Sequence, residues 1–186
     1  MTEPELIDGL IIQNKEAIQY LVNNHQKRII KTAYYFVANM EDAEDLSQEV
    51  ILEILRSVGH YKKKASLSTW IYRITVNRSL DHLRRQKRRS FFRMNEMKRV
   101  EQEPASIDTT NDDKEKRNIL DMAVNSLPVN QKIAFVLNKY DDLAYKEIAE
   151  IMNLSLSSVE SLIHRAKMNL QKKLANYFSE YAKDKK

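Results

Sequence analysis

The residues of this sequence that could do chemistry are grouped by charge rather than in a catalytic pattern. Six acids and no base lie between positions 41 and 55, whereas eleven bases and one acid lie between positions 56 and 89. On a helical projection, an apolar stripe lies opposite a polar side made up of Glu41, Asp42, Asp45, Gln48, Glu49 and Glu53. The acidic side favours a basic protein partner and the adjoining basic segment favours nucleic acid. An ordinary solvated acidic face is the alternative interpretation.

No spacing typical of an enzyme or a metal site accompanies these charges. Di-iron bundles use Glu-x-x-His and zinc proteases use His-Glu-x-x-His, but no glutamate lies three residues before any of the four histidines. His25 has no second ligand at i+3 or i+4, so we interpret it as a solvated histidine on a helix surface. The sequence also has no nucleophile–base pair and no phosphate-binding loop. We therefore expect no catalytic residues, no metal and no cofactor.

Composition favours a helical protein. A chain of 186 residues could form one large domain or two small ones, and its 2 Gly and 3 Pro are few. There is no Cys, which excludes disulfides and thiolate metal sites. No apolar run approaches a membrane span, and the acidic N-terminus lacks the order of a signal peptide. We expect a soluble, cytoplasmic protein without membrane insertion, and its net charge of +5 is compatible with a polyanionic partner.

Hydrophobic periodicity divides the first half of the chain into helices. Residues 3–40 indicate two helices, followed by the acidic helix, which we expect Gly59 to end. Residues 60–69 are expected to form a loop, and residues 70–89 a long helix. We expect Tyr72, Val76, Leu80 and Leu83 to form the core stripe of that long helix.

The second half indicates a linker and another helical domain. Residues 100–113 carry five acids and no base, a composition typical of disorder. Helices are expected over 119–126 and from Pro128 to about Tyr140, and residues 143–174 indicate two short helices around a turn at 153–155. The core expected for this helix-turn-helix is Ile148, Ala149, Met152, Leu154, Val159 and Ile163. The predicted organisation is all-α, with domains at 1–90 and 118–186 joined by a flexible acidic linker at 91–117.

Two segments resemble a known family. The run DAEDLSQEVILEILRSVGHYKKKASLSTWIYRITVNRSLDHLRR (42–85) is similar to the promoter-recognition domain of extracytoplasmic-function sigma factors, the small two-domain members of the bacterial sigma superfamily. The run LAYKEIAEIMNLSLSSVESLIHRAKMNLQKKL (143–174) resembles the domain of these proteins that binds the minus-thirty-five promoter element. The resemblance implies a sigma factor that binds core RNA polymerase and directs it to promoter DNA. An anti-sigma factor is a usual partner in this family.

The resemblance also assigns residues. The polymerase-binding set is Asp42, Asp45, Gln48 and Glu49. The set for the minus-ten element is Tyr61, Lys62, Lys63, Lys64, Trp70, Arg73, Ile74, Asn77, Arg84 and Arg85. The set for the minus-thirty-five element is Ser158, Ser161, His164, Arg165 and Lys167. In the family, the linker threads the RNA path of the polymerase, whereas a plain tether is the simpler interpretation.

Elementary chemistry agrees with the minus-ten set. An aromatic ring such as Tyr61 can stack on an extruded base, an amide such as Asn77 can pair with a base edge, and lysines can contact phosphates. Taken singly, Tyr61 could instead be a core or hinge residue and Asn77 a buried structural amide. Trp70 could be core packing or a wedge at the duplex edge, and the basic run 84–89 a solvated helix end.

The sequence departs from the family at several positions. Many relatives carry a glycine and an acidic or small residue where Lys63 and Lys64 stand, and often an aromatic in place of Leu67. The family often has basic residues in place of Glu160 and Leu162. We predict that Ser157 and Glu160 form a capping box. The alternative function is a stand-alone helix-turn-helix regulator that binds DNA without polymerase.

Overall fold

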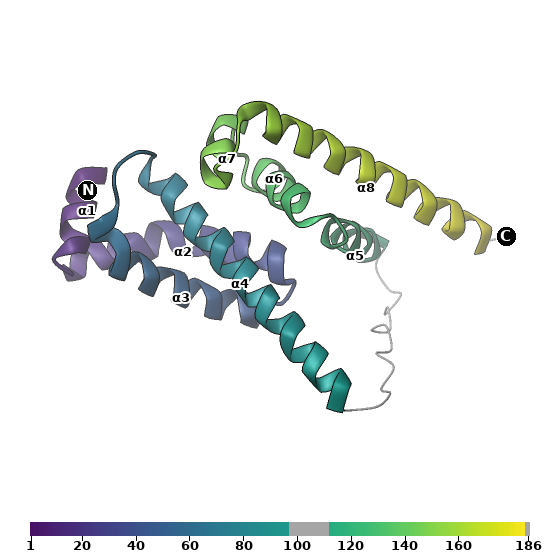
Figure 1. Cartoon of the computed structure of the whole chain (residues 1–186), viewed down its shortest axis with the longest axis horizontal. Coiled ribbons are helices and arrows are strands. Elements are labelled where there is room, and N and C mark those ends of the chain that lie inside the picture. The colour runs from purple at the N-terminus through teal and green to yellow at the C-terminus, as the bar shows by residue number, and fades with distance from the viewer. Residues whose placement is uncertain (97–111, 185–186) are drawn as a thin grey trace.

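The computed structural model describes the backbone of residues 1–96 and 112–184, and the side chains of residues 1–89 and 119–175. Within these ranges the chain is helical, with one 3-10 turn and no strand, which confirms the predicted all-α class. The helices form two groups, α1 to α4 and α5 to α8 (Figure 1). None of the described helices is both long and apolar enough to cross a bilayer.

The element bounds confirm most of the predicted helices. The first group is α1 (Glu3–Ile11), α2 (Lys15–Val37), α3 (Met40–Ser57), the 3-10 turn η1 (Val58–His60) and α4 (Leu67–Glu96). The second group is α5 (Asp112–Asn125), α6 (Val129–Lys139), α7 (Tyr145–Met152) and α8 (Leu156–Asp184). The helix-turn-helix is therefore confirmed as α7 and α8, with its turn at residues 153–155.

Short polar side chains begin the helices of the first group. The Asn14 side-chain oxygen accepts from the backbone N–H groups of Glu16 and Ala17 at 2.8 and 3.2 Å, which caps α2. Asn39 caps α3 in the same way, accepting from the N–H of Asp42 at 3.0 Å. Gly9 lets α1 lie close to α2, because a Cβ there would come within 2.7 Å of the Ala17 Cβ.

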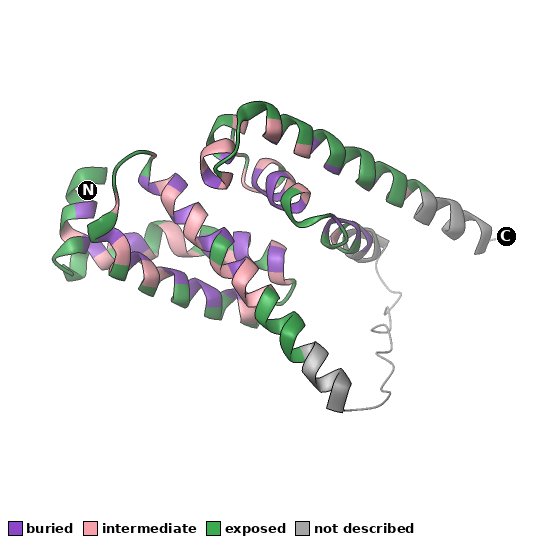
Figure 2. Ribbon diagram, viewed as in Figure 1, coloured by how far each residue is buried: buried purple, intermediate pink, exposed green. Residues whose placement is uncertain are grey.

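Each group of helices buries an apolar core. The first is lined by residues of α1 to α4: Leu6, Ile7, Leu10, Ala17, Leu21, Ile29, Val50, Ile54, Val58, Leu67 and Ile71. The second contains Ile133, Leu137, Ile148, Val159 and Ile163 of the second group, but it also includes Phe36, Tyr72 and Val76 from α2 and α4. The buried faces of α2 and α4 can be followed in Figure 2. The two groups are therefore joined by a shared apolar cluster.

Several predicted boundaries are wrong by a few residues. The acidic helix ends at Ser57 and continues as η1, and Gly59 does not adopt the left-handed backbone of a glycine cap. The next helix begins at Leu67 rather than Trp70, because the Ser66 hydroxyl accepts from the Thr69 N–H at 3.1 Å and caps it.

The predicted linker and helix-turn-helix also differ from the structure. Helix α4 continues to Glu96 and α5 begins at Asp112, both inside the predicted linker, and residues 97–111 of that linker lie outside the described residues. The second helix of the helix-turn-helix is long rather than short. Leu154, predicted as core, is 39% exposed because it lies in the turn between the helices.

Candidate polymerase and nucleic-acid interfaces

Helix α3 presents a polar surface to solvent. Its buried side includes Ala43, Leu46, Val50 and Ile54. Met40 and Arg56 are exposed at its two ends. The exposed residues between them, which we call the outer face of α3, are Glu41, Glu44, Asp45, Gln48, Glu49 and Leu52. Three of the four predicted polymerase-binding residues, Asp45, Gln48 and Glu49, therefore lie together and are free to meet a partner. Four carboxylates on one helix face attract a basic surface.

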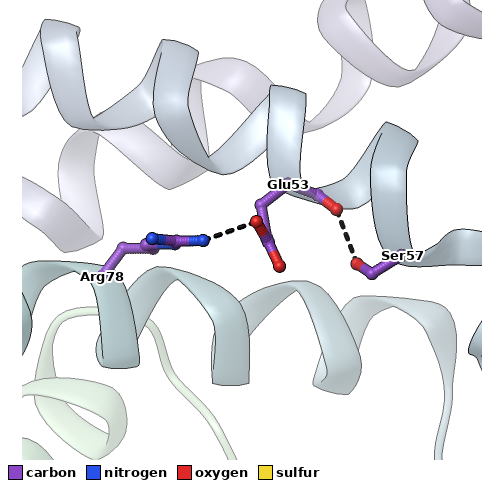
Figure 3. Close-up of polar contacts among 3 residues, drawn as sticks. All are labelled: Glu53, Ser57 and Arg78. Carbon is purple, nitrogen blue, oxygen red and sulfur yellow. Dashed lines mark hydrogen bonds and ion pairs between the residues drawn. The ribbon is translucent and has the colours of Figure 1, made fainter.

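The remaining acids of α3 contact α4 and are only partly exposed to solvent. Glu53 accepts from the guanidinium of Arg78 at 2.5 Å, and its backbone carbonyl accepts from the Ser57 hydroxyl (Figure 3). Asp42, the fourth predicted polymerase residue, is half-buried with its carboxylate 3.6 Å from the His82 ring. The helical projection placed both acids on the polar side but could not show that α4 lies beside that side.

The loop after η1 holds the predicted base-stacking aromatic. The Tyr61 ring lies against Trp70, with centroids 5.1 Å apart and planes inclined by 36°, and its hydroxyl donates to the Ala65 carbonyl. Burial raises the pKa of the Tyr61 hydroxyl, which keeps it a donor. Both rings are half-buried against the first core. Tyr61 therefore has a packing role in this conformation, as the simpler interpretation expected.

The three lysines of this loop are exposed. Lys63 has a φ of 54°, in the left-handed region that glycine adopts without strain. The exposed ammonium groups remain available for phosphates.

The predicted minus-ten residues on α4 fall into two environments. Asn77 is exposed, so the alternative of a buried structural amide is wrong, and Ile74 is half-buried beside the first core. Arg84 and Arg85 are exposed, and Arg84 makes only a surface pair with Asp81 at 3.1 Å, which a phosphate could replace.

Arg73 lies in a different environment from the rest of this set. Its guanidinium Nη2 donates to the backbone carbonyl of Glu150, at the C-terminal part of α7. Its Nε is buried, with no hydrogen-bond partner among the described residues. In this conformation Arg73 therefore contributes to a contact between the two groups of helices and is only partly exposed to solvent.

Helix α8, the predicted recognition helix, buries one apolar side. Val159, Ile163, Ala166 and Leu170 are buried. Four of the predicted minus-thirty-five residues, Ser161, His164, Arg165 and Lys167, are exposed, and Ser158 is half-buried. Glu160 lines a shallow recess of about 300 Å³ together with Ser161, His164 and Arg165. Glu160 therefore shares the surface of the predicted DNA-binding residues.

The predicted capping box at Ser157 and Glu160 is wrong. The cap of α8 is Ser155, whose hydroxyl oxygen accepts from the Ser158 N–H at 3.2 Å. Ser157 already lies inside the helix, so Glu160 stands beyond its capping position. The carboxylate of Glu160 is consequently not explained by a capping role.

No group of three or more His, Asp or Glu side chains within the described residues could hold a metal ion. The prediction of a solvated His25 is wrong. This histidine is half-buried between α2 and α4, and burial lowers the pKa of its imidazole.

Sequence reasoning missed the residues that join the two groups of helices. Lys132 of α6 is buried, and its Nζ donates to the Phe36 carbonyl at 3.1 Å and to the Asn125 side-chain oxygen at 2.6 Å. Thr32 of α2 donates to Asp141, which follows α6, at 2.9 Å. Lys132 and Phe36 lie 96 positions apart, and Thr32 and Asp141 lie 109 positions apart. No local pattern in the sequence could therefore have paired them.

Comparison with known proteins matches both groups of helices. Residues 21–89 match the family model of Sigma-70 region 2, and residues 117–170 match that of Sigma-70 region 4. The ECF RNA polymerase sigma factor SigE of Mycolicibacterium smegmatis is 35% identical over 163 residues, covering 87% of this chain and 63% of the relative. The RNA polymerase sigma-H factor of Pseudomonas aeruginosa is 26% identical over 92% of this chain and 93% of its own length. The chain thus spans less than two thirds of the length of the Mycolicibacterium smegmatis relative.

The fold also matches a solved structure. The sigma factor RpoE, solved in complex with the anti-sigma factor NepR from Bartonella quintana, has a TM-score of 0.64 with 20% identity, covering 87% of this chain and 98% of its own. Two helical domains with these two matched regions define a two-domain sigma factor, the class of protein that directs RNA polymerase to promoters. The chain belongs to the extracytoplasmic-function sigma factors of the sigma-70 family.

Proposed function

We propose that this sigma factor binds core RNA polymerase through the outer face of α3 and reads the two promoter elements with α4 and α8. The observation that carries the proposal is the separation of charge on exposed surfaces. Exposed carboxylates gather on α3, whereas exposed bases gather on the loop 62–64, on the end of α4 and on α8. The first surface suits a basic protein face and the others suit phosphates.

The proposal assigns no chemistry to the chain itself: polymerase catalyses RNA synthesis, and the sigma factor acts in the cytoplasm without catalytic residues. Residues 1–90 would form the domain for core binding and the minus-ten element, and residues 118–186 the domain for the minus-thirty-five element. An anti-sigma factor is an expected partner, because a structural neighbour, RpoE, was solved with one.

The direct test is transcription by a defined system. The purified chain is added to sigma-free core polymerase with a library of templates whose minus-ten and minus-thirty-five positions are randomised. We expect transcripts from a subset of templates that share a sequence at both positions. If core polymerase gives the same transcripts with and without the chain, the proposed function is wrong. Specific duplex binding without polymerase, in that case, would favour a stand-alone regulator.

The outer face of α3 is tested by charge reversal. Replacing Asp45 and Glu49 with lysine should reduce co-purification with core polymerase at least ten-fold, because two attractive charges become repulsive. The matched control replaces Asp8 and Glu16, two exposed acids outside α3, with lysine. Both variants should keep wild-type helicity. Full core binding by the α3 variant would show that polymerase binds elsewhere.

A further inference from the structure

A cavity of about 280 Å³ is lined by the end of α2, by α4 and by the segment that leads from α5 into α6. These helices can be followed in Figure 1. Most of the lining is apolar and consists of Phe36, Val37, Ala38, Leu80, Leu83, Leu127 and Val129. The polar lining consists of Lys87, Asn125 and Lys132. Mostly apolar walls with a few polar groups are typical of sites for small molecules, and the volume lies near the lower end of their range.

Both ionisable side chains that line this cavity are lysines. Lys132 is only 7% exposed, and its Nζ donates to the Phe36 carbonyl and to the Asn125 side-chain oxygen, which are neutral groups. Within the described residues these two bonds use two of the three N–H donors of the ammonium. Lys87 is exposed to solvent. The cavity therefore has one ammonium inside its wall and a second where water reaches it.

The positive charge of the cavity is not balanced by the residues that line it. Burial lowers the pKa of the Lys132 ammonium to about 8, and the charge of Lys87 acts in the same direction. The Phe36 carbonyl lies at the C-terminal end of α2, where the helix dipole supplies roughly half a negative charge. Half a charge does not offset two ammonium groups, so the cavity attracts an anion.

We propose that this cavity binds a small aliphatic carboxylate, an anion of the fatty-acid type. The carboxylate accepts from the ammonium groups of Lys132 and Lys87, because hydrogen bonds between ionised groups are the strong ones. Its chain lies against aliphatic side chains of the wall, which removes apolar surface from water. An aliphatic chain suits this wall better than an aromatic one, because the wall has one ring, Phe36, and Lys132 Nζ lies 5.5 Å from its centroid.

The site is separate from the residues that serve the proposed function. None of the lining residues belongs to the sets assigned to polymerase or to the two promoter elements. Binding is measured on the full chain without polymerase or DNA, so the result does not bear on the proposed function.

The first experiment titrates the purified chain by calorimetry with octanoate, 1-octanol and acetate. Octanoate should bind at least about ten-fold more tightly than 1-octanol, which has the chain without the charge. It should also exceed acetate, which has the charge without the chain, by about ten-fold or more. Equal affinities of octanoate and 1-octanol, or of octanoate and acetate, would overturn the proposal.

Replacing the lysines tests the anion-binding groups. Lys87→Met should weaken octanoate binding by about ten-fold and leave 1-octanol binding unchanged, and its exposed position keeps the fold intact. Lys132→Met should weaken octanoate binding in the same direction. The matched control is Lys15→Met, an exposed lysine at the opposite end of α2, which should bind octanoate as wild type does. Unchanged octanoate affinity in either cavity variant would overturn the proposal.

A variant that keeps both lysines tests the position of the bound anion. Val129 lines the cavity, is 53% exposed and occupies the first position of α6, where a carboxylate suits the helix dipole. Val129→Glu should therefore fold normally but repel octanoate, weakening its binding by about ten-fold, whereas Val129→Gln should bind it nearly as wild type does. Thermal unfolding of both variants confirms that they are folded. Equal octanoate affinities of Val129→Glu and Val129→Gln would contradict binding in this cavity.

Nuclear Overhauser contacts locate the chain of the bound probe. Those from octanoate should reach the methyl groups of Leu80, Leu83 and Leu127, which line the cavity. Contacts only to methyl groups outside the cavity would overturn the assignment of the site.

Discussion

Tyr61 has an observed packing role and a proposed base-stacking role, and a pair of substitutions can separate the two. Its ring packs on Trp70 and its hydroxyl bonds to the loop carbonyl of Ala65. Tyr61→Phe keeps the ring and should retain most open-complex formation. Tyr61→Ala should lose stacking of about 1–3 kcal/mol per base and form open complexes much more weakly, with core binding unchanged. Equal loss of core binding and promoter opening in Tyr61→Ala would mean that the residue is structural.

We predict that Glu160 of α8 opposes DNA binding. It lies beside His164 and Arg165 in the same recess, and the cap of the helix is Ser155 instead. Glu160→Gln should therefore tighten duplex binding by removing repulsion from phosphates, with little change in salt dependence. Glu160→Lys should tighten it more and steepen the dependence on salt if the ammonium reaches a phosphate. Titrations at several salt concentrations measure both effects.

A specific outcome would contradict the placement of Glu160 at the DNA. If neither variant binds promoter or unrelated duplex more tightly than wild type, the side chain points away from bound DNA. Because the capping box is absent, such a result could not be attributed to a compensating loss of a helix cap. Thermal unfolding of both variants provides the control for stability.

At the scale of elements, α3 and α4 are fixed against each other by an ion pair as well as by apolar packing. The Glu53 and Arg78 side chains are 30% and 33% exposed, so solvent screens their attraction. A double-mutant cycle with Glu53→Gln and Arg78→Met should give a coupling of about 1 kcal/mol in the free energy of unfolding, measured with urea. Additive effects of the two substitutions would show that the pair only accompanies the packing.

We propose that α3 uses its two polar sides differently. The acids that contact α4 help to orient α3, and the acids of the outer face are the proposed polymerase-binding residues. Substituting Glu53 should therefore change stability more than core binding, whereas substituting Asp45 and Glu49 should do the reverse. This division follows from the position of α4 beside α3 rather than from the composition of either helix.

At the scale of the whole molecule, we expect Lys132 to make stability depend on pH. Desolvation by burial lowers the pKa of its ammonium to about 8, and the charge of Lys87 acts in the same direction. Between about pH 8 and 10 the unfolded chain, with an ordinary lysine, binds more protons than the folded one. The free energy of unfolding should therefore rise with pH over this window, by up to about 1.4 kcal/mol per pH unit.

Above about pH 10 the trend should reverse. Burial raises the pKa values of Tyr35, Tyr72 and Tyr140, so the unfolded chain loses its phenolic protons first and stability falls. Urea unfolding at a series of pH values measures both limbs. Lys132→Met should abolish the rise and keep the fall. An unchanged rise in that variant would assign the effect to another group.

The sequence alone determined the helical class, most helix positions and the charge division, because these depend on local periodicity and local composition. The apolar stripe of α3 and the core of the helix-turn-helix follow from a period of 3.6 residues, which places each side chain on one side of its own helix. The resemblance to a family was also carried by runs of neighbouring residues, and the matches to regions 2 and 4 confirm it. The assigned site residues remain predictions.

Only the tertiary structure decided which partner lies against each side of a helix. The resemblance assigned Arg73 to the minus-ten element, but its guanidinium donates to the carbonyl of Glu150, 77 positions later. The helical projection likewise placed Asp42 and Glu53 with the other acids of α3, although both contact side chains of α4. The buried ammonium of Lys132 and the pairing of Thr32 with Asp141 had no local signal at all. Contacts between distant segments depend on how the helices pack as solid bodies, and a one-dimensional pattern does not contain that arrangement.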